Sequence, residues 1–393
     1  GEAKGHLQPC TGLTTAMPPL EPGSCVAVTG AAGYLGSWVV HTLLQKGYRV
    51  RACVRDTSHE KVDFLRRMPA FASGRLTLRG CELRCQEAGG EQGELFSGCQ
   101  GVVHAAADPD MPLEGRVDDY LSVSRSVLQS VRACGSVSRV LFTSSQAAIA
   151  GDVDLEELRQ RPVIDEERYP NLENPRNQDL KAFGYTLAKL RCEELFREAA
   201  EASGGRWDAI LVNPSDNLGP LLSRHHADPR QAWTPWHCHV ALALEGRPVG
   251  PAWAYKPLWV VDVRDAAEAH VRLLESPLAV AGNRYHVCAG HAIAVEDVGD
   301  AIAKLLPEAQ LEPSPPPVGE DRQPEHFRYL EGRAGEAREV WAACRLRNGK
   351  VLAAAAGLAF RPLEETLRDC AESLMAVAGV QPRRRADQRA GMQ

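Results

Sequence analysis

The chain has 393 residues, of which 44% are hydrophobic and 24% charged, as in an ordinary globular protein that buries a sizeable core. Its formal net charge of −6 provides no broad basic surface, so we expect neither nucleic acid nor an anionic membrane as its main partner. No apolar run reaches the roughly 20 residues that a membrane-spanning helix needs. We therefore predict no membrane span.

The twelve cysteines are scattered, without a CxxC pair, and several fall in segments predicted to be buried, such as Cys25, Cys53 and Cys192. This pattern indicates free thiols in a reducing compartment, and we expect a cytoplasmic protein. Because the chain begins at Gly1, the alternative is location in a plastid or another organelle after removal of a targeting peptide.

Short β-rich runs alternate with helical stretches in the first half of the chain. The predicted strands are Cys25–Thr29, Arg49–Arg55, Gly101–Ala106, Arg139–Ser144 and Ala209–Asn213, with a later one at Asn283–Cys288. The predicted helices are Leu35–Lys46, Asp118–Cys134, Tyr185–Ala202 and, near the end, Pro362–Val377. The alternation predicts an α/β fold with a parallel sheet and crossover helices.

The polar ends of the chain suggest tails. We expect an N-terminal tail at 1–23 and a disordered tail at 378–393. The Pro-rich, charged stretch Gln310–Pro324 is expected to be a surface loop or linker.

The segment VAVTGAAGYLGSW places Gly30, Gly33 and Gly36 directly after a predicted strand and at the start of a predicted helix. In that context the glycines indicate a turn that lets a pyrophosphate approach the helix N-terminus, where free N–H groups and the helix dipole favour an anion. A tight turn that needs glycine only for packing is the alternative.

The end of the second predicted strand discriminates between dinucleotides. An Asp or Glu there binds the ribose hydroxyls of NAD. This chain has Arg55 at that place and Lys61 shortly after it, and both cations favour the 2′-phosphate of NADP(H). Asp56 follows Arg55 directly and leaves NAD as the alternative.

Tyr185 and Lys189 form a YxxxK pair in a predicted helix, so they share one face a single turn apart. A lysine ammonium stabilises a phenolate, which makes tyrosine a usable acid or base. Ser144 and Ser145 follow the fourth predicted strand, at the end where α/β sheets bind ligands. We favour Ser145 as the hydroxyl that holds a substrate carbonyl, with a strand-end cap as the alternative.

Taken together, these segments resemble the extended short-chain dehydrogenase/reductase family, and within it the dihydroflavonol reductase and cinnamoyl-CoA reductase group. The likeness extends from about Ser24 to Val377. Its pieces are VTGAAGYLGSWVV, YRVRACVRD, RVLFTSS, PVIDEERY, YTLAKLRCEEL, VNPSDNLGP, VVDVRDAAEAHVRLLE and FRPLEETLRDC.

The resemblance implies a Rossmann-type doubly wound parallel sheet with a smaller C-terminal substrate lobe. It implies an NADP-binding Rossmann domain at 24–215, to which 259–289 returns, and a substrate-binding lobe at 216–258 and 290–377.

The resemblance also implies a role for each matched residue. Ser145 orients the carbonyl, Tyr185 donates the proton and Lys189 tunes Tyr185. The residues implied to bind NADP(H) are Gly30, Gly33, Tyr34, Leu35, Gly36, Arg55, Lys61, Ala105, Pro214 and Ser215. No metal is implied.

The chain departs from the group at positions that bear on the substrate. Cinnamoyl-CoA reductases carry Asn-Trp-Tyr-Cys before the catalytic tyrosine, where this chain has Lys181 to Gly184. Dihydroflavonol reductases place a substrate-reading Asn five residues after the catalytic serine, where Ala150 stands. Glu82 replaces the Asp in the third strand's usual Ala-Asp-Leu. Ser126 replaces the Gly that is common in the helix before the fourth strand. Neither named substrate therefore follows from the sequence.

The segment Arg224–His239 opens the expected substrate lobe. Its Trp233 and Trp236, with the neighbouring histidines, could line an aromatic pocket or could serve lobe packing or an interface, and both interpretations stay open. Four histidines in it could suggest a metal, but the resemblance requires none. His104 is interpreted as a hydrogen-bonded strand-end histidine rather than a catalyst.

The leading functional hypothesis is NADPH-dependent reduction of an aldehyde or ketone of moderate size, a small-molecule carbonyl substrate. One alternative is oxidation of a 3β-hydroxysteroid-type alcohol with NAD, which Arg55 disfavours. The other is a non-catalytic nucleotide-binding subunit of a larger assembly, which the retention of serine, tyrosine and lysine disfavours. A homodimer or association with a larger complex is open.

Overall fold

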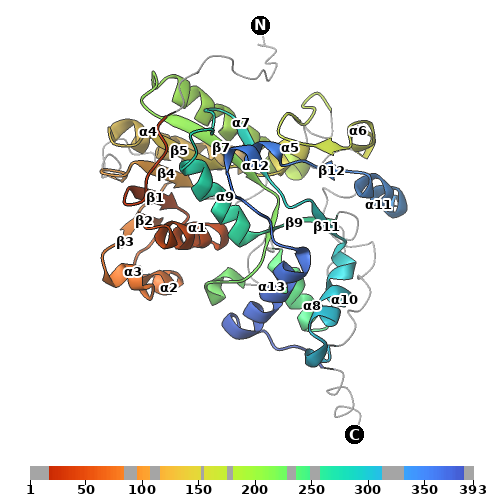
Figure 1. Ribbon diagram of the computed structural model, residues 1–393. Helices are drawn as coiled ribbons and strands as arrows, with labels where there is room; N and C mark the ends of the chain where they lie inside the picture. Colours follow the sequence, from red (N-terminus) through yellow and green to blue (C-terminus); the bar gives the residue numbers. More distant parts are fainter. Residues whose placement is uncertain are drawn as a thin grey trace.

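The computed structural model describes most of the chain as a sheet-centred body with a smaller lobe below it (Figure 1). The residues described are 17–83, 95–106, 116–151, 155–174, 180–227, 236–247, 257–311 and 332–384. No helix within these ranges is long and apolar enough to cross a membrane.

A seven-stranded parallel sheet forms the centre of the molecule, in the order β10-β7-β5-β4-β1-β2-β3. Its strands are β1 (Cys25–Thr29), β2 (Arg49–Val54), β3 (Leu76–Gly80), β4 (Gly101–His104), β5 (Arg139–Thr143), β7 (Asp208–Pro214) and β10 (Arg284–Val287). The strand order reverses between β1 and β4, which is where such sheets bind nucleotides, beyond the carboxyl ends of the strands. The predicted fold class is confirmed.

Successive residues of each strand enter opposite hydrophobic layers, as the pleat of a strand requires. Val26 and Val28 of β1 belong to one core cluster, and Ala27 between them belongs to the other. The same alternation separates Leu141 from Val140 and Phe142 in β5. Both faces are thus buried, which explains why the strands are nearly continuous apolar runs.

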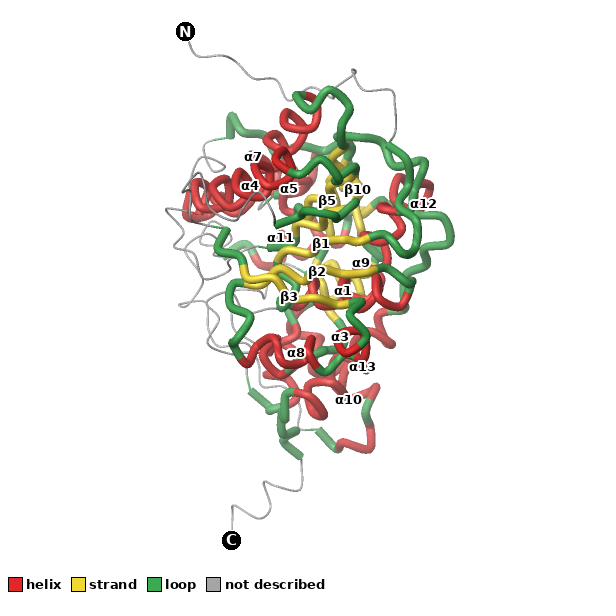
Figure 2. Tube along the Cα trace, turned by 90° about the vertical axis from the view of Figure 1, so that its left-hand side faces the viewer, coloured by secondary structure: helices red, strands yellow, loops and turns green. Residues whose placement is uncertain are grey.

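Helices cover both faces of the sheet (Figure 2). α1 (Tyr34–Gln45), α9 (Val263–Leu274) and α12 (Gly349–Ala354) lie on one face, and α4 (Arg116–Ala133) and α7 (Leu180–Glu201) pack together on the other. The helices expected at Leu35–Lys46, Asp118–Cys134 and Tyr185–Ala202 are therefore present with shifted ends.

The lobe has its own small sheet and core. Its strands are β8 (Asp216–Leu218), β9 (Leu258–Asp262) and β11 (His291–Ile293), in the order β11-β9-β8. α8 (His237–Leu244), α10 (Val298–Leu305) and α13 (Leu363–Val377) pack around a cluster that includes Leu218, Ile302 and Leu367. Part of the range expected for the lobe instead lies on the main sheet, since α12 packs on β10 and α9.

Short elements complete the described chain. They are η1 (Glu60–Val62), α2 (Asp63–Arg66), α3 (Pro69–Ala72), α5 (Ala147–Ala150), α6 (Leu155–Gln160), β6 (Val163–Ile164), η4 (Arg224–Ala227), η6 (Val295–Asp297), η7 (Pro307–Ala309), α11 (Ala334–Ala342) and β12 (Arg345–Leu346).

Part of each segment that the sequence suggested as a tail packs on the fold. At the N-terminal side, Leu20 is buried and its N–H donates to the carbonyl of Leu274 at 3.0 Å. At the other end, the N–H of Arg383 donates to the carbonyl of Leu244 at 2.8 Å. The boundaries expected between domain and lobe stay a prediction.

A buried ion pair holds the amino ends of β5 and β7 together. The guanidinium of Arg139 donates to both carboxylate oxygens of Asp208, the shortest contact being 2.9 Å, and the side chains are 0% and 4% exposed. Arg139 also donates to the carbonyls of Ser276 at 2.7 Å and Met17 at 3.0 Å. This pair lies at the opposite edge of the sheet from the candidate site.

Candidate active site

The turn after β1 is shaped by close backbone contacts that exclude side chains. Gly30 has φ +70°, and a Cβ there would lie 2.8 Å from Cα of Ala106 in the turn after β4. A Cβ on Gly36 would lie 2.2 Å from the carbonyl oxygen of Gly30, whereas one on Gly33 would lie 3.2 Å from it. Gly30 and Gly36 are thus required by the geometry of the turn itself.

The N-terminus of α1 begins at this turn and is open to an anion. Gly33 is its N-cap and supplies no side-chain cap, and the first turn of the helix contains no acidic residue. Its first N–H groups, at Tyr34 and Leu35, and the helix dipole together favour a phosphate. Ala105 lies opposite, where its N–H donates to the carbonyl of Thr29 at 3.3 Å. These residues fit a dinucleotide diphosphate.

Tyr34 differs from its neighbours because its side chain faces the lobe. Its hydroxyl donates to the carbonyl of Gly219 at 2.8 Å, and its ring centroid lies 4.8 Å from that of His237. Trp38, one turn later, donates to the carbonyl of Pro220 at 2.9 Å. The first helix therefore fixes the start of the lobe relative to the glycine turn.

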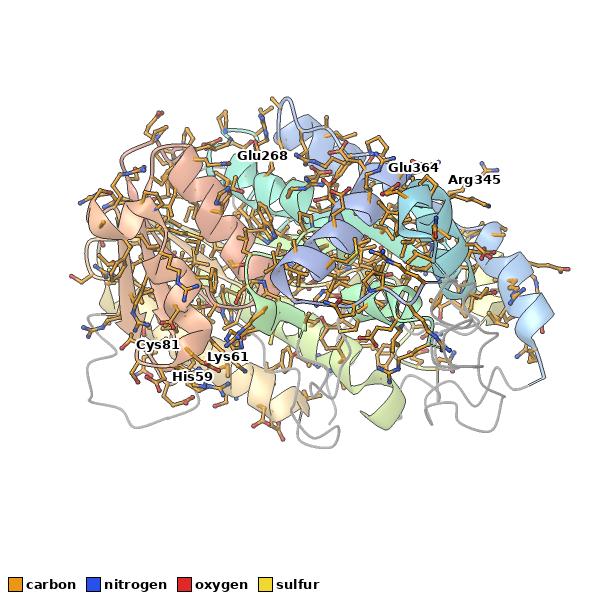
Figure 3. All side chains as sticks on the ribbon, turned by 90° about the horizontal axis from the view of Figure 1, so that it is seen from below. His59, Lys61, Cys81, Glu268, Arg345 and Glu364 are labelled. Atoms are coloured by element: carbon orange, nitrogen blue, oxygen red, sulfur yellow. The ribbon has the colours of Figure 1, made fainter. Side chains whose placement is uncertain are left out.

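The carboxyl end of β2 presents exposed cations. Arg55 is 69% exposed and lies 3.9 Å from the carboxylate of Glu82, which follows β3. Lys61 is also exposed, and Figure 3 shows it with His59 at the same end of the molecule as Cys81, just beyond β3. Asp56 caps its own turn by accepting from the N–H and hydroxyl of Ser58 at 2.7 and 2.6 Å, and these bonds lower its pKa.

Tyr185 and Lys189 lie on α7, where their four-residue spacing puts them on one face. Lys189 is buried, with 4% exposure, and its Nζ lies 5.8 Å from the ring centroid of Tyr185. The ring of Tyr120 on α4 meets the Tyr185 ring edge to face, with centroids 6.0 Å apart. Lys189 lies 5.3 Å from the Tyr120 ring as well. Tyr185 is thus held between an ammonium and an aromatic edge.

The two serines after β5 have different surroundings. Ser144 is buried, and its hydroxyl donates to Oε1 of Glu193 at 2.5 Å. Ser145 is partly exposed, and its Oγ accepts from the N–H of Ala147 at 3.1 Å. The hydroxyl of Ser145 still has donor capacity for a ligand. This difference supports the choice of Ser145 that the sequence favoured.

Pro214 is the last residue of β7, the strand beside β5, and Ser215 follows it. The carbonyl of Pro214 accepts from the N–H of Gln146 at 2.8 Å, and the N–H of Ser215 donates to the carbonyl of Val287 at 3.0 Å. The hydroxyl of Ser215 is buried without a hydrogen-bond partner among the described residues. A buried hydroxyl in that state favours a polar ligand beside it.

Two histidines of the expected site, His104 and His226, are buried, and burial lowers the pKa of each to about 3. His104 Nδ1 lies 2.7 Å from Oγ1 of Thr29, and burial lowers the pKa of His104 to about 3, so it serves the strand ends. His226 lies 3.3 Å from the carbonyl of Ala32 in the glycine turn. Trp233 lies outside the described residues. Within those residues no three candidate ligands are placed to hold a metal ion.

Sequence reasoning missed a buried polar cluster behind the serines. Glu193 on α7 accepts from Asn213 Nδ2 at 2.8 Å and from Nε of Arg284 at 2.6 Å, besides Ser144. Asn213 also donates to the carbonyl of Ser145 at 3.0 Å. Two signals were available: Glu193 stands four residues after Lys189, and Arg284 is a charged residue at the start of a predicted strand.

Comparison with known proteins places the chain in a family of enzymes. The chain belongs to the NAD dependent epimerase/dehydratase family, whose profile matches residues 26–288. Dihydroflavonol 4-reductase of Hordeum vulgare is 31% identical over 307 residues, which cover 77% of this chain and 80% of that protein. Cinnamoyl-CoA reductase 2 of Arabidopsis thaliana is 32% identical, over 74% of this chain and 80% of its own.

Among solved structures, the yeast methylglyoxal/isovaleraldehyde reductase Gre2, complexed with NADPH, matches with a TM-score of 0.68. The match covers 90% of this chain and 99% of that one at 22% identity, and so supports the fold. The resemblance expected from the sequence is confirmed, and so is the predicted class, an NAD(P)-dependent oxidoreductase.

Proposed function

We propose that this protein is an NADPH-dependent reductase of an aldehyde or ketone, with Ser145, Tyr185 and Lys189 as its catalytic residues. The observation that carries the proposal is the placement of Lys189. It is buried beside the ring of Tyr185 and tied to the strand that ends just before Ser145. A tyrosine with a fixed ammonium beside it and a serine hydroxyl at the same sheet edge suits carbonyl chemistry.

The cofactor is NADP(H), and several residues fit it. The N–H groups at the start of α1 would bind the diphosphate, at a turn where a Cβ on Gly36 would lie 2.2 Å from the Gly30 carbonyl. Arg55 and Lys61 would neutralise the 2′-phosphate, since both are exposed after β2. Pro214 and Ser215 would hold the nicotinamide end of the cofactor. When bound, the cofactor supplies the hydride that the carbonyl carbon receives.

The residues of the chain perform the proton chemistry. The hydroxyl of Ser145 donates a hydrogen bond to the substrate carbonyl oxygen and orients it. The hydroxyl of Tyr185 gives its proton to that oxygen as the carbon is reduced. The ammonium of Lys189, held by the Thr143 carbonyl at 2.9 Å, stabilises the phenolate left on Tyr185.

The substrate is a small molecule of moderate size with some apolar character. The group's two named substrates are not assigned, because Lys181 to Gly184 and Ala150 replace the residues that accompany them. The relatives at about 31% identity, named as reductases of dihydroflavonols and cinnamoyl-CoA, support a carbonyl in such a molecule.

The second candidate function is a non-catalytic nucleotide-binding subunit, alone as a homodimer or in a larger complex. It would require NADPH to bind without turnover. The buried Lys189 and its contact with Tyr185 argue against it, because a scaffold has no use for a desolvated ammonium beside a tyrosine. The cytoplasmic location expected from the sequence remains a prediction.

A carbonyl panel with purified protein tests the function. NADPH consumption is followed at 340 nm for aldehydes and ketones of graded size, with Tyr185→Phe assayed in parallel. We expect turnover of at least one class and a loss of about 10²- to 10⁴-fold in Tyr185→Phe. Undiminished turnover in that variant would refute the mechanism. Tight NADPH binding without turnover of any carbonyl would favour the scaffold instead.

A further inference from the structure

The polar cluster around Glu193 lies between the helix that carries Tyr185 and the strands that end at Ser145 and Asn213. All four of its side chains are buried: Glu193 is 0% exposed, Asn213 0%, Arg284 2% and Ser144 4%. One carboxylate oxygen accepts from Ser144 and Asn213, and the other accepts from Arg284. Its hydrogen-bond donors therefore lie on β7, on β10 and directly after the end of β5, while Arg197, one turn later on α7, lies 3.7 Å from the second carboxylate oxygen.

Helix α7 is anchored to the sheet at two successive turns. Lys189 donates to the carbonyl of Thr143, and Glu193, one turn later, accepts from the hydroxyl of Ser144. Tyr185 stands one turn before Lys189 on the same face. The two anchors bind consecutive residues of β5 and its end, directly before Ser145. They fix both the rotation of the helix and its position along the strand.

Ser145 is also held through its backbone. Its carbonyl accepts from Asn213 Nδ2, and the same Nδ2 donates to Glu193, so one amide group joins the carboxylate to the serine. Arg284 is fixed in turn by the carbonyl of Arg168 at 2.9 Å and by the ring of Tyr169, 3.7 Å from its guanidinium carbon.

We propose that Glu193 is a positioning residue that sets the placement of Ser145 relative to Tyr185 and Lys189, with Arg284 holding its charge. This proposal rests on the catalytic roles proposed above. The carboxylate touches neither substrate nor cofactor. It acts by fixing the strand end and the helix against each other, and hydride transfer is sensitive to displacements of about 1 Å.

The buried charges of the cluster are by themselves weak evidence that it stabilises the fold. Burying an ion pair has a desolvation penalty that its attraction repays only with good geometry, and apolar replacements are often as stable. The Arg139–Asp208 pair is equally buried but binds the amino ends of the strands. That second pair provides a control with the same chemistry at the opposite edge of the sheet.

The test compares Glu193→Gln and Ser144→Ala with Asp208→Asn. All three are assayed for kcat, KM for NADPH and KM for the carbonyl, at a temperature where circular dichroism shows each variant folded. We expect kcat to fall on the order of 10²-fold in Glu193→Gln and less in Ser144→Ala, with KM for NADPH unchanged. Asp208→Asn should lower the unfolding temperature and leave kcat as in the unmodified protein.

Hydrogen exchange of the peptide covering residues 143–151 supplies a readout that needs no turnover. In Glu193→Gln the amides of this segment should exchange faster, including the Ala147 N–H that donates to Ser145, while Asp208→Asn should leave them protected. If kcat and the exchange rates in Glu193→Gln equal those of the original protein, the inference is overturned. If that happens while Tyr185→Phe is inactive, only the positioning role fails. If Tyr185→Phe is fully active, the proposed function fails instead.

Discussion

The ammonium of Lys189 donates a hydrogen bond of 2.9 Å to the backbone carbonyl of Thr143, the last residue of β5. Lys189 is thereby held on the side of α7 that faces the sheet, with its Nζ 5.8 Å from the Tyr185 ring. A flexible lysine would spend most of its time in water, whereas this one is fixed where it can act on the tyrosine.

Replacing Lys189 by methionine should remove the ammonium and keep most of the buried volume. We expect kcat to fall about 10²- to 10⁴-fold, since the phenolate loses its stabilising charge. Steady-state kinetics on the best substrate of the carbonyl panel measure it. Lys46→Met is the matched control, because Lys46 pairs with Glu275 at 2.9 Å, away from the site. Equal losses in both variants would contradict the role of Lys189.

Adding one methyl group at Gly36 should disturb the glycine turn more than adding one at Gly33. In Gly36→Ala the new Cβ would lie 2.2 Å from the Gly30 carbonyl oxygen, so the turn must open. In Gly33→Ala the same distance is 3.2 Å, which a small shift relieves. We expect NADPH to raise the unfolding temperature of Gly33→Ala but not of Gly36→Ala, as measured by differential scanning fluorimetry. Equal protection of both variants would refute this geometry.

Removing the Arg55 guanidinium should change cofactor preference more than turnover. A charge-assisted contact with the 2′-phosphate contributes about 1.5–3 kcal/mol, so KM for NADPH should rise about 10- to 100-fold in Arg55→Ala. KM for NADH should stay the same. Arg49→Ala, at the other end of β2, is the control. A parallel rise for NADH would show that Arg55 does not read the phosphate.

Buried histidines should make the fold sensitive to acid. Burial lowers the pKa of His104 and His226 to about 3, and of His237, His239, His270 and His286 to about 4, from an ordinary 6.5. In the unfolded chain they take up protons below pH 6.5, while the folded chain stays neutral. Stability is therefore full above pH 6.5 and is lost as the pH falls toward 4.

Each such histidine costs about 2 kcal/mol at pH 5, which is a large part of the stability of a typical domain. Urea unfolding at pH 7.5, 6 and 5 should show a steep loss. His270→Gln should lower by about one the number of protons taken up on unfolding, and so should reduce the slope of the free energy of unfolding against pH. A pH-independent free energy of unfolding would contradict burial of these side chains.

The sequence alone determined the features that are local in the chain. Gly30 and Gly36 mark a strand–turn–helix because Gly30 adopts φ +70° and a Cβ on Gly36 would lie 2.2 Å from the Gly30 carbonyl oxygen, a clash between near neighbours in the chain. Tyr185 and Lys189 share a face because any helix places residues four apart together. The strands could be predicted because both faces of a parallel sheet are buried, which makes each strand a nearly continuous apolar run.

Only the tertiary structure decided how Ser144 and Ser145 divide their roles, since that depends on Glu193 lying beneath one of them. Arg284 meets Glu193 across 91 residues of chain, and no periodicity in the sequence encodes such a contact. The same holds for Leu20 and Arg383, which pack on the fold although their segments suggested tails. Local geometry follows from neighbouring residues, whereas these pairings follow from strand order and from which faces the helices cover.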